Sequence, residues 1–166
     1  EKQPLPGGDL ATRYPLRAAV GILHGKVDVE GFLQENRQHF PHGEEEIEMI
    51  LQQLRNRKGI AETTSCGRIL DAVSAILGVC YERTYEGEPS MKLESTAIGG
   101  KDILGLKPII HNGVLQTTPL LQEIYANRTK HAKEDLAYSA HTYLARGLAA
   151  LAIQMADENG VEITGF

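Results

Sequence analysis

The chain has 166 residues, a formal net charge of −5 at pH 7, 42% hydrophobic residues and 23% charged residues. This length suits one ordinary domain with a substantial core, and the composition excludes an intrinsically disordered chain. The acidic balance argues against a nucleic-acid surface over the whole chain, and no apolar run approaches the ~20 residues that a membrane span needs.

The first part of the chain predicts a tight turn followed by two short helices. Pro6-Gly7-Gly8-Asp9 has the composition of a turn. Pro15 suits the first turn of a helix, which Gly25 can end. Asp28 is a typical N-cap residue and predicts a second short helix, which ends before Pro41.

A third helix is predicted over residues 43–59, "GEEEIEMILQQLRNRKG". Its acidic residues lie in the first turn and its basic residues in the last, as the helix dipole prefers. We expect Gly59 to end it. Its end also holds a local basic cluster, because Arg55, Arg57 and Lys58 lie close together.

The fourth predicted helix, over residues 65–78, has one apolar side and one side of small residues with a single carboxylate. Helical spacing places four residues on that small side: Gly67, Asp71, Ser74 and Gly78. A fifth helix is predicted to begin near Gly87 or Pro89 and to run to about Ala97.

The second half predicts a hairpin, two more helices and a closing strand. Asn112-Gly113 between apolar runs indicates a type I′ turn, and Thr118 is expected to cap a short helix. The longest helix is predicted over residues 133–158, and the alternating run "VEITGF" at 161–166 predicts a strand. The chain is therefore predicted to be mostly α-helical, with one β-hairpin and a terminal strand.

Histidine and cysteine patterns do not predict a metal or a nucleophilic site. The six histidines lack ligand spacing, and His141 fits a hydrogen-bonded packing role better than a ligand. Cys66 lies near a helix N-terminus, where a thiol pKa can fall, but no base is near it in sequence, which favours an inert thiol. With two cysteines and no CxxC pair, a reducing compartment and hence a cytoplasmic location are expected. No GxxxxGK[ST] or GxGxxG phosphate motif occurs.

Two segments remain as candidate ligand-facing surfaces. A carboxylate at Asp71 among small residues could accept hydrogen bonds from ribose hydroxyls or an amino group. It could equally bond a backbone amide where two helices pack closely. At the second segment, Gly87 leaves unpaired amides at a helix start, where a polar ligand can bind. Glu88 and Glu94 could hydrogen-bond a sugar there, or could be solvated acids of the helix.

Taken together, five segments of the chain resemble a known family. They are "LPGGD" (5–9), "SCGRILDAVSAILGVC" (65–80), "RTYEGEPSMKLE" (83–94), "HTYLARGLA" (141–149) and "ITGF" (163–166). Their order and spacing are similar to those of the C-terminal domain of HypF, the carbamoyltransferase family that matures nickel–iron hydrogenases. The start at Glu1 and the strand-like ending favour a fragment, so residues 1–166 are expected to be a single truncated domain of such a protein.

The resemblance implies an α/β nucleotide-binding fold of the actin-like ATPase (ASKHA) class. It implies that the whole protein uses carbamoyl phosphate and ATP, forms a carbamoyl-adenylate, and carbamoylates the C-terminal cysteine of HypE. Asp71, Gly87 and Glu94 match positions that contact the nucleoside in that family. The family's metal-binding histidines match a segment before Glu1, so no metal ligand is expected in this chain, and none of its residues is assigned as catalytic.

Two other functions remain open on the sequence. The first is a relative of the TsaD threonylcarbamoyl transferases that modify tRNA, which an acidic chain fits less well. The second is a non-catalytic helical interaction module with solvated acidic faces. We expect neither a membrane nor a nucleic-acid partner, weak nucleotide binding by the fragment alone at most, and self-association as a homodimer.

Overall fold

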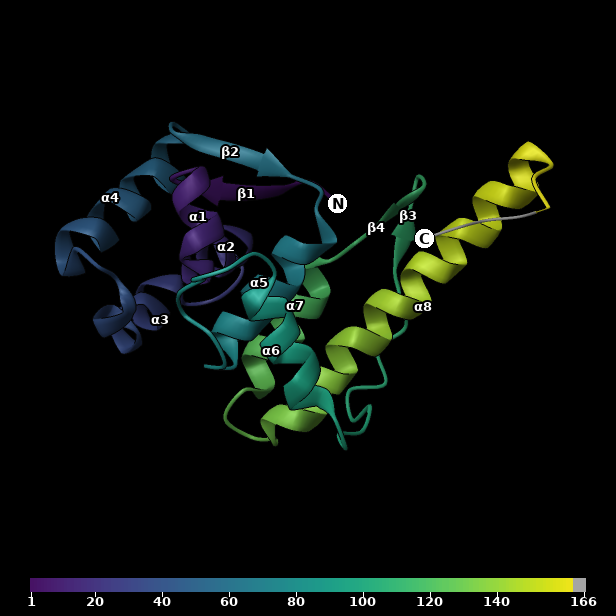
Figure 1. The fold of residues 1–166 in the computed structure, drawn as a ribbon. Helices are drawn as coiled ribbons and strands as arrows, with labels where there is room; N and C mark the ends of the chain where they lie inside the picture. The colour runs from purple at the N-terminus through teal and green to yellow at the C-terminus, as the bar shows by residue number, and fades with distance from the viewer. Residues whose placement is uncertain (163–166) are drawn as a thin grey trace.

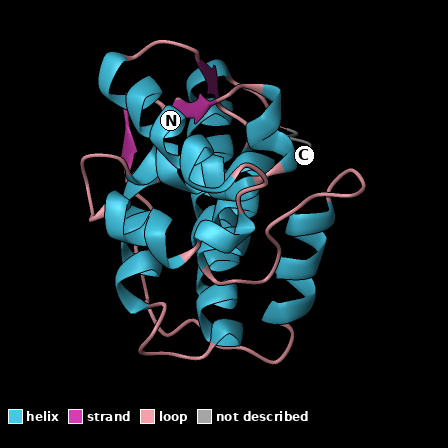
Figure 2. Cartoon of the chain, turned by 90° about the vertical axis from the view of Figure 1, so that its left-hand side faces the viewer, coloured by secondary structure: helices cyan, strands magenta, loops and turns pink. Residues whose placement is uncertain are grey.

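The computed structural model describes residues 1–162, and helices dominate it (Figures 1 and 2). The α-helices are α1 (Asp9–Arg13), α2 (Pro15–Leu23), α3 (Val29–Glu35), α4 (Gly43–Asn56), α5 (Cys66–Ile76), α6 (Glu88–Ala97), α7 (Thr118–Asn127) and α8 (Lys133–Asn159), with a short 3-10 helix η1 (Arg37–His39). The strands form two antiparallel pairs: β1 (Gln3–Pro6) with β2 (Ile60–Thr63), and β3 (Ile110–His111) with β4 (Val114–Leu115). The mostly helical prediction with a β-hairpin is confirmed.

Local chemistry places most helix ends where the sequence predicted them. Helix α2 begins at Pro15, and the Asp28 side chain caps α3 by accepting a hydrogen bond from the Gly31 amide at 2.9 Å. The hairpin turn has positive φ at both Asn112 (50°) and Gly113 (71°), as a type I′ turn requires.

Two predicted helix ends were wrong by one or two residues. Helix α4 ends at Asn56, its C-cap residue Arg57 adopts the left-handed conformation with a φ of 52°, and Gly59 then turns the chain into β2. The N-cap of α7 is Thr117, not Thr118, and the amides of both threonines donate to the Glu1 carboxylate at 2.7 and 2.9 Å. A carboxylate distant in sequence thus does the capping that a local hydroxyl was expected to do.

The β1–β2 sheet was not predicted. Its register pairs Gln3 with Thr63 and Pro6 with Ile60, so the turn at Gly7-Gly8 follows a strand. Strand β1 has only four residues, two of them proline, so it shows no alternation of apolar and polar residues. Its pairing with β2 joins segments that lie far apart in sequence. The predicted closing strand extends to Phe166, and its residues beyond 162 lie outside those described.

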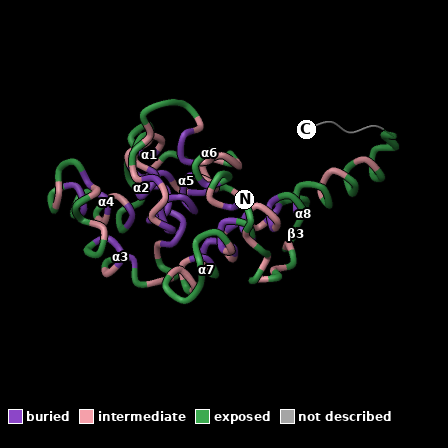
Figure 3. The backbone as a smooth tube through the Cα atoms, turned by 60° about the horizontal axis from the view of Figure 1, so that its bottom comes forward, coloured by how far each residue is buried: buried purple, intermediate pink, exposed green. Residues whose placement is uncertain are grey.

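The core forms around α2, all nine residues of which are buried. Helix α2 packs on α5, β1 and α7, while α6 packs on both α5 and α8. Figure 3 shows this buried centre where α2, α5 and α6 meet, with exposed backbone toward the outer end of α8. The arrangement places α5 and α6, the two helices that carry the candidate site, side by side.

Helix α8 is covered in its first half and projects from the body in its second (Figure 1). Leu136 and Leu144 are buried, whereas Leu148 is 38% and Met155 is 44% exposed. The apolar residues along the outer part of this helix are therefore only partly covered by the described residues. No helix within residues 1–162 is both long and apolar enough to cross a membrane.

Candidate functional site

The candidate site lies where α5 packs against the beginning of α6. The Ser90 hydroxyl of α6 donates a hydrogen bond of 2.7 Å to Oδ1 of Asp71 on α5. The same hydroxyl lies 3.4 Å from the Gly67 carbonyl oxygen, one turn earlier on α5. The two segments that the sequence singled out therefore share one interface.

The Asp71 carboxylate is almost completely buried, with 1% of the residue exposed. Burial raises the pKa of Asp71, and the hydrogen bond from Ser90 and the positive charges of Arg68 and Arg83 offset only part of that shift. Arg68 Nη2 lies 2.9 Å from Asp71 Oδ2. The alternative in which Asp71 bonds a backbone amide is wrong, because its partners are a hydroxyl and a guanidinium.

Several buried polar atoms around Asp71 lack well-oriented hydrogen-bond partners within residues 1–162. They are Oδ2 of Asp71, Oγ of Ser74 and Nη1 of Arg68, all on the same helix. An unsatisfied buried polar atom costs roughly 1–3 kcal/mol, so native proteins rarely leave several together. The donor and acceptor set fits the hydroxyl and amino groups of a polar ligand.

Gly87 forms the N-cap of α6 in the left-handed conformation, with a φ of 79°. A Cβ atom built on it would meet only the Met91 side chain, at 3.8 Å. The space beside Gly87 is therefore open, and the backbone conformation is what favours glycine.

The interpretation of Glu88 as a solvated acid is wrong. The residue is 5% exposed, and its carboxylate accepts hydrogen bonds from the Thr84 amide and hydroxyl and pairs with Lys92 at 2.7 Å. These contacts, with Lys92 the largest contributor, lower the pKa of Glu88 to about 2. Glu88 braces the loop that leads into α6 and has little capacity left for a sugar.

Glu94 lies exposed on α6, one helical turn beyond Ser90. The structure thus places Asp71 in direct contact with α6, Gly87 at the start of that helix and Glu94 one turn further along. Their contact with a nucleoside stays a prediction.

A polar recess of about 520 Å³ lies beside the loop before α6, and none of Asp71, Gly87 and Glu94 lines it. Its lining comes from the end of α1 and from that loop: Thr12, Arg13, Glu82, Arg83, Thr84, Tyr85 and Glu86. The Arg83 amide donates to the Arg13 carbonyl at 2.8 Å, and the Arg13 side chain bonds Glu82. The loop is therefore fixed to α1 at one end and to α6 at the other.

Sequence reasoning missed Arg68, Arg83 and Ser90 as neighbours of Asp71. The three-residue spacing of Arg68 and Asp71 was a readable signal for an ion pair on one helix face. Ser90 had no such signal, because its role depends on how α5 and α6 pack.

The remaining titratable candidates have structural surroundings. His141 Nδ1 lies 2.8 Å from the Ala137 carbonyl oxygen, which confirms its packing role. Burial raises the pKa of the Cys66 thiol, consistent with an unreactive cysteine. Residues 1–162 hold no group of three or more potential metal ligands.

Comparisons with known proteins give one consistent family. Residues 1–165 match the family described as carbamoyltransferase, Kae1-like domain, second subdomain. The chain is 40% identical to the "Probable carbamoyltransferase HypF" of Methanocaldococcus jannaschii, covering 100% of the chain and 22% of that relative. It is 33% identical to the carbamoyltransferase HypF of Rhodobacter capsulatus, covering 98% of the chain and 21% of that relative.

Solved structures agree with this assignment. The HypF of T. kodakarensis superposes with a TM-score of 0.87 at 39% identity, over 98% of this chain and 22% of that one. A full-length HypF in a phosphate- and nucleotide-bound form superposes with a TM-score of 0.80 at 26% identity, over 97% of this chain and 25% of that one. The chain thus spans about a fifth to a quarter of the length of these four relatives.

Proposed function

The chain belongs to the HypF carbamoyltransferase family, as the second subdomain of the Kae1-like domain, and from this premise we propose that it forms one wall of a nucleotide pocket. The observation that carries the proposal is the buried Asp71 carboxylate between α5 and α6, surrounded by polar atoms that lack partners within residues 1–162. Nucleotide binding by a full-length relative supports it.

In the proposed reaction, the full-length protein takes a carbamoyl group from carbamoyl phosphate, with ATP as the second substrate. Water releases phosphate from carbamoyl phosphate, and the resulting carbamate displaces diphosphate from ATP to give carbamoyl-adenylate. The thiol of the C-terminal cysteine of HypE then takes the carbamoyl group, with AMP as the leaving group. The reaction takes place in the cytoplasm, within a domain of the actin-like ATPase class. The contribution of this chain is to bind and orient the nucleoside.

Each site residue has a separate proposed task. Asp71 accepts hydrogen bonds from ribose hydroxyls, and Ser90 and Arg68 hold its carboxylate in position. Gly87 lets the backbone approach the ligand, since the Met91 side chain is the one neighbour within 4 Å of the place where a Cβ atom would lie. Glu94 hydrogen-bonds an exposed edge of the nucleoside from the next turn of α6.

Carbamoyl transfer to HypE in the full-length protein tests this assignment. We expect Asp71→Ala and Glu94→Ala each to lower the rate about tenfold or more, because each removes a charge-assisted hydrogen bond to substrate. Glu48→Ala, an exposed carboxylate on α4, is the matched control and should keep full activity. Unchanged transfer in both site variants would instead support a non-catalytic interaction module.

The isolated chain is expected to bind nucleotide weakly, because in this proposal it supplies one wall of the pocket. A calorimetric titration of residues 1–166 with ATP should give no micromolar binding. Micromolar affinity in that titration would show that the pocket is complete within this chain.

A further inference from the structure

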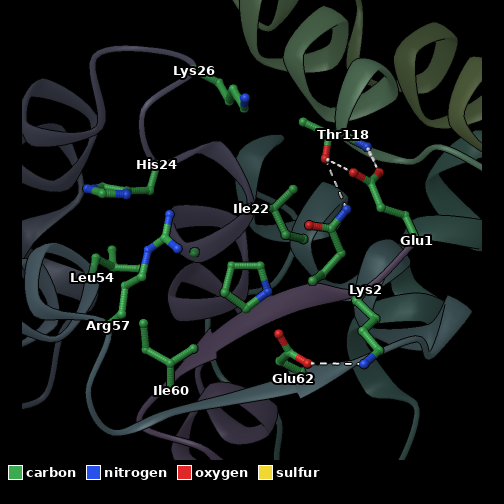
Figure 4. Close-up of a pocket in the computed structure, with 13 residues that line it drawn as sticks. Glu1, Lys2, Ile22, His24, Lys26, Leu54, Arg57, Ile60, Glu62 and Thr118 are labelled. Atoms are coloured by element: carbon green, nitrogen blue, oxygen red, sulfur yellow. Dashed lines mark hydrogen bonds and ion pairs between the residues drawn. The ribbon is translucent and has the colours of Figure 1, made fainter.

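A second cavity, of about 490 Å³, lies on the β1–β2 side of the molecule, lined by residues that the nucleotide site does not use (Figure 4). Its floor is largely apolar and is formed by Pro4, Ile22, Leu54 and Ile60. This volume falls within the roughly 300–1,000 Å³ that small-molecule sites occupy.

The floor depends on a close approach between α2 and β1. A Cβ atom at Gly21 would lie 2.3 Å from the Pro4 carbonyl oxygen, so only glycine allows strand β1 to pass this near the last turn of α2. The cavity is thus built by the core packing of the two elements.

Basic side chains from three segments surround one side of this cavity. His24 is the C-cap residue of α2, Lys26 follows it in the loop, and Arg57 is the C-cap residue of α4. In Figure 4 the Arg57 side chain reaches toward the floor, Lys26 lies at the rim above it, the His24 ring is turned outward beside Arg57, and Glu1 and Lys2 lie on the opposite side.

Some of the charged groups that line the cavity have ion-pair or hydrogen-bond partners, and others have no carboxylate partner within residues 1–162. Glu62 pairs with Lys2 at 3.5 Å, and the Glu1 carboxylate accepts from the amides at the start of α7. Within residues 1–162, by contrast, neither Lys26 nor Arg57 has a carboxylate partner within 4.0 Å. The cavity therefore presents uncompensated positive charge above an apolar floor.

Basic residues also stabilise helix C-termini through the helix dipole, and this accounts for Arg55 and Lys58 near the end of α4. It does not account for Arg57 in a left-handed conformation, where glycine or asparagine is usual at a helix end. Nor does it explain why His24, Lys26 and Arg57 all line one cavity.

We propose that this cavity binds an organic phosphate monoester of about the size of a sugar phosphate. The dianionic phosphate would lie between Arg57 and Lys26, with His24 beside it, and the uncharged body would cover the apolar floor. This site is independent of the nucleotide wall between α5 and α6.

Solution NMR of the 166-residue chain, titrated with ribose 5-phosphate, tests the proposal. We expect amide shifts at Gly25, Lys26 and Gly59, and none at Gly67 or Gly87, which lie in the nucleotide site. Inorganic phosphate should bind more weakly because it lacks a body for the floor, and ribose should not bind. Should the isolated chain give a poorly dispersed spectrum, hydrogen exchange over residues 22–26 and 54–60 of the full-length protein gives the same readout.

Two variants separate a defined site from diffuse charge. Arg57→Gly should weaken ribose 5-phosphate binding about tenfold or more, without loss of folding, because glycine suits the left-handed position. Lys58→Ala removes an adjacent charge that does not line the cavity and should leave affinity within about twofold. Equal losses in the two variants, equal binding of inorganic phosphate, or no shift up to about 10 mM ligand would overturn the proposal.

Discussion

Asp71 shows how a residue can be placed at the expense of stability. Its carboxylate is buried, and burial raises its pKa above the ordinary value of 3.8 despite the nearby hydroxyl and guanidinium. The charged form is therefore less stable in the folded chain than in the unfolded one. Such a cost is common where a group is retained for binding. An asparagine at this position has nearly the same shape without the charge and should not carry this cost.

We expect Asp71→Asn to be about as stable as the wild type at pH 7, because the amide removes the cost of the buried charge while Arg68, whose side chain is 15% exposed, loses its ion pair. Because the folded pKa is raised, the wild type should lose stability as pH rises from about 3.8 through the raised folded pKa. The variant should lack this dependence. Urea unfolding at several pH values between 4 and 7 measures both effects, and a variant that is clearly less stable at pH 7 would contradict them.

The pKa shift of Glu88 has the opposite direction to that of Asp71. Lys92 and Thr84 hold its pKa at about 2, below the ordinary value of 4.5, so its stabilising contribution is present above pH 4.5 and is lost as pH falls toward 2. Glu88→Gln should remove this part of the acid sensitivity and loosen the loop before α6.

Thermal unfolding of wild type and Glu88→Gln between pH 2 and 6 checks this expectation. The melting temperatures of the two proteins should be equal near pH 2, should diverge between pH 2 and 4.5, and should stay a constant interval apart above pH 4.5. Glu86→Gln, an exposed acid in the same loop, serves as the control. Parallel curves over the whole range would show that Glu88 does not brace the loop.

At this scale the sequence selected individual residues but not the partners that they contact. Asp71 and Gly87 were selected because a lone carboxylate among small residues and a glycine before a helix have readable physical uses. Ser90 and the bracing role of Glu88 were not, because both depend on contacts between segments that no local pattern encodes.

Among the elements, α2 and α4 are joined by a buried ion pair. Arg17 Nε and Nη2 lie 2.9 and 2.6 Å from Glu46 Oε1, and the other oxygen of Glu46 accepts from the His42 amide at 3.0 Å. Both side chains are only 1% exposed. Removing one partner leaves the other charge buried alone, which typically costs about 3–5 kcal/mol.

Glu46→Gln should therefore lower the free energy of unfolding by about 3 kcal/mol. The double variant Arg17→Met with Glu46→Leu should recover most of that loss, because an apolar pair carries no charge to bury. Chemical denaturation of the three proteins checks both statements. A single variant as stable as the wild type would mean that the pair does not hold α4 on α2.

Helices were predictable here because caps, prolines and apolar periodicity act within a few residues. The β1–β2 sheet was not, since its strands are four residues each and pair across a long stretch of chain. The prediction for the end of α4 was wrong for a related reason: Arg57 takes a left-handed conformation in which glycine was the expected residue.

For the whole molecule, the outer half of α8 exposes several large apolar side chains. Ile153 is 63% and Met155 is 44% exposed, and both lie beyond the part of the helix that α6 covers. Apolar surface of this kind favours association between copies of the chain.

We therefore expect the 166-residue chain to form dimers whose fraction rises with concentration. Replacing Ile153 and Met155 together by glutamate should raise the dissociation constant about tenfold or more, because it places charge on the apolar face. Gln154→Glu adds a charge to the same turn and should have little effect. Sedimentation across a concentration series decides the matter, and a monomer at every concentration would contradict the expectation.

The central claim is that α5 and α6 hold a nucleoside through Asp71. The most direct measurement is the nucleotide dissociation constant of the full-length protein, compared by calorimetry among wild type, Asp71→Asn and the exposed control Glu48→Gln. The account predicts an increase of about tenfold or more for Asp71→Asn, in a protein that is no less stable, and no change for the control. An unchanged dissociation constant in Asp71→Asn would contradict it.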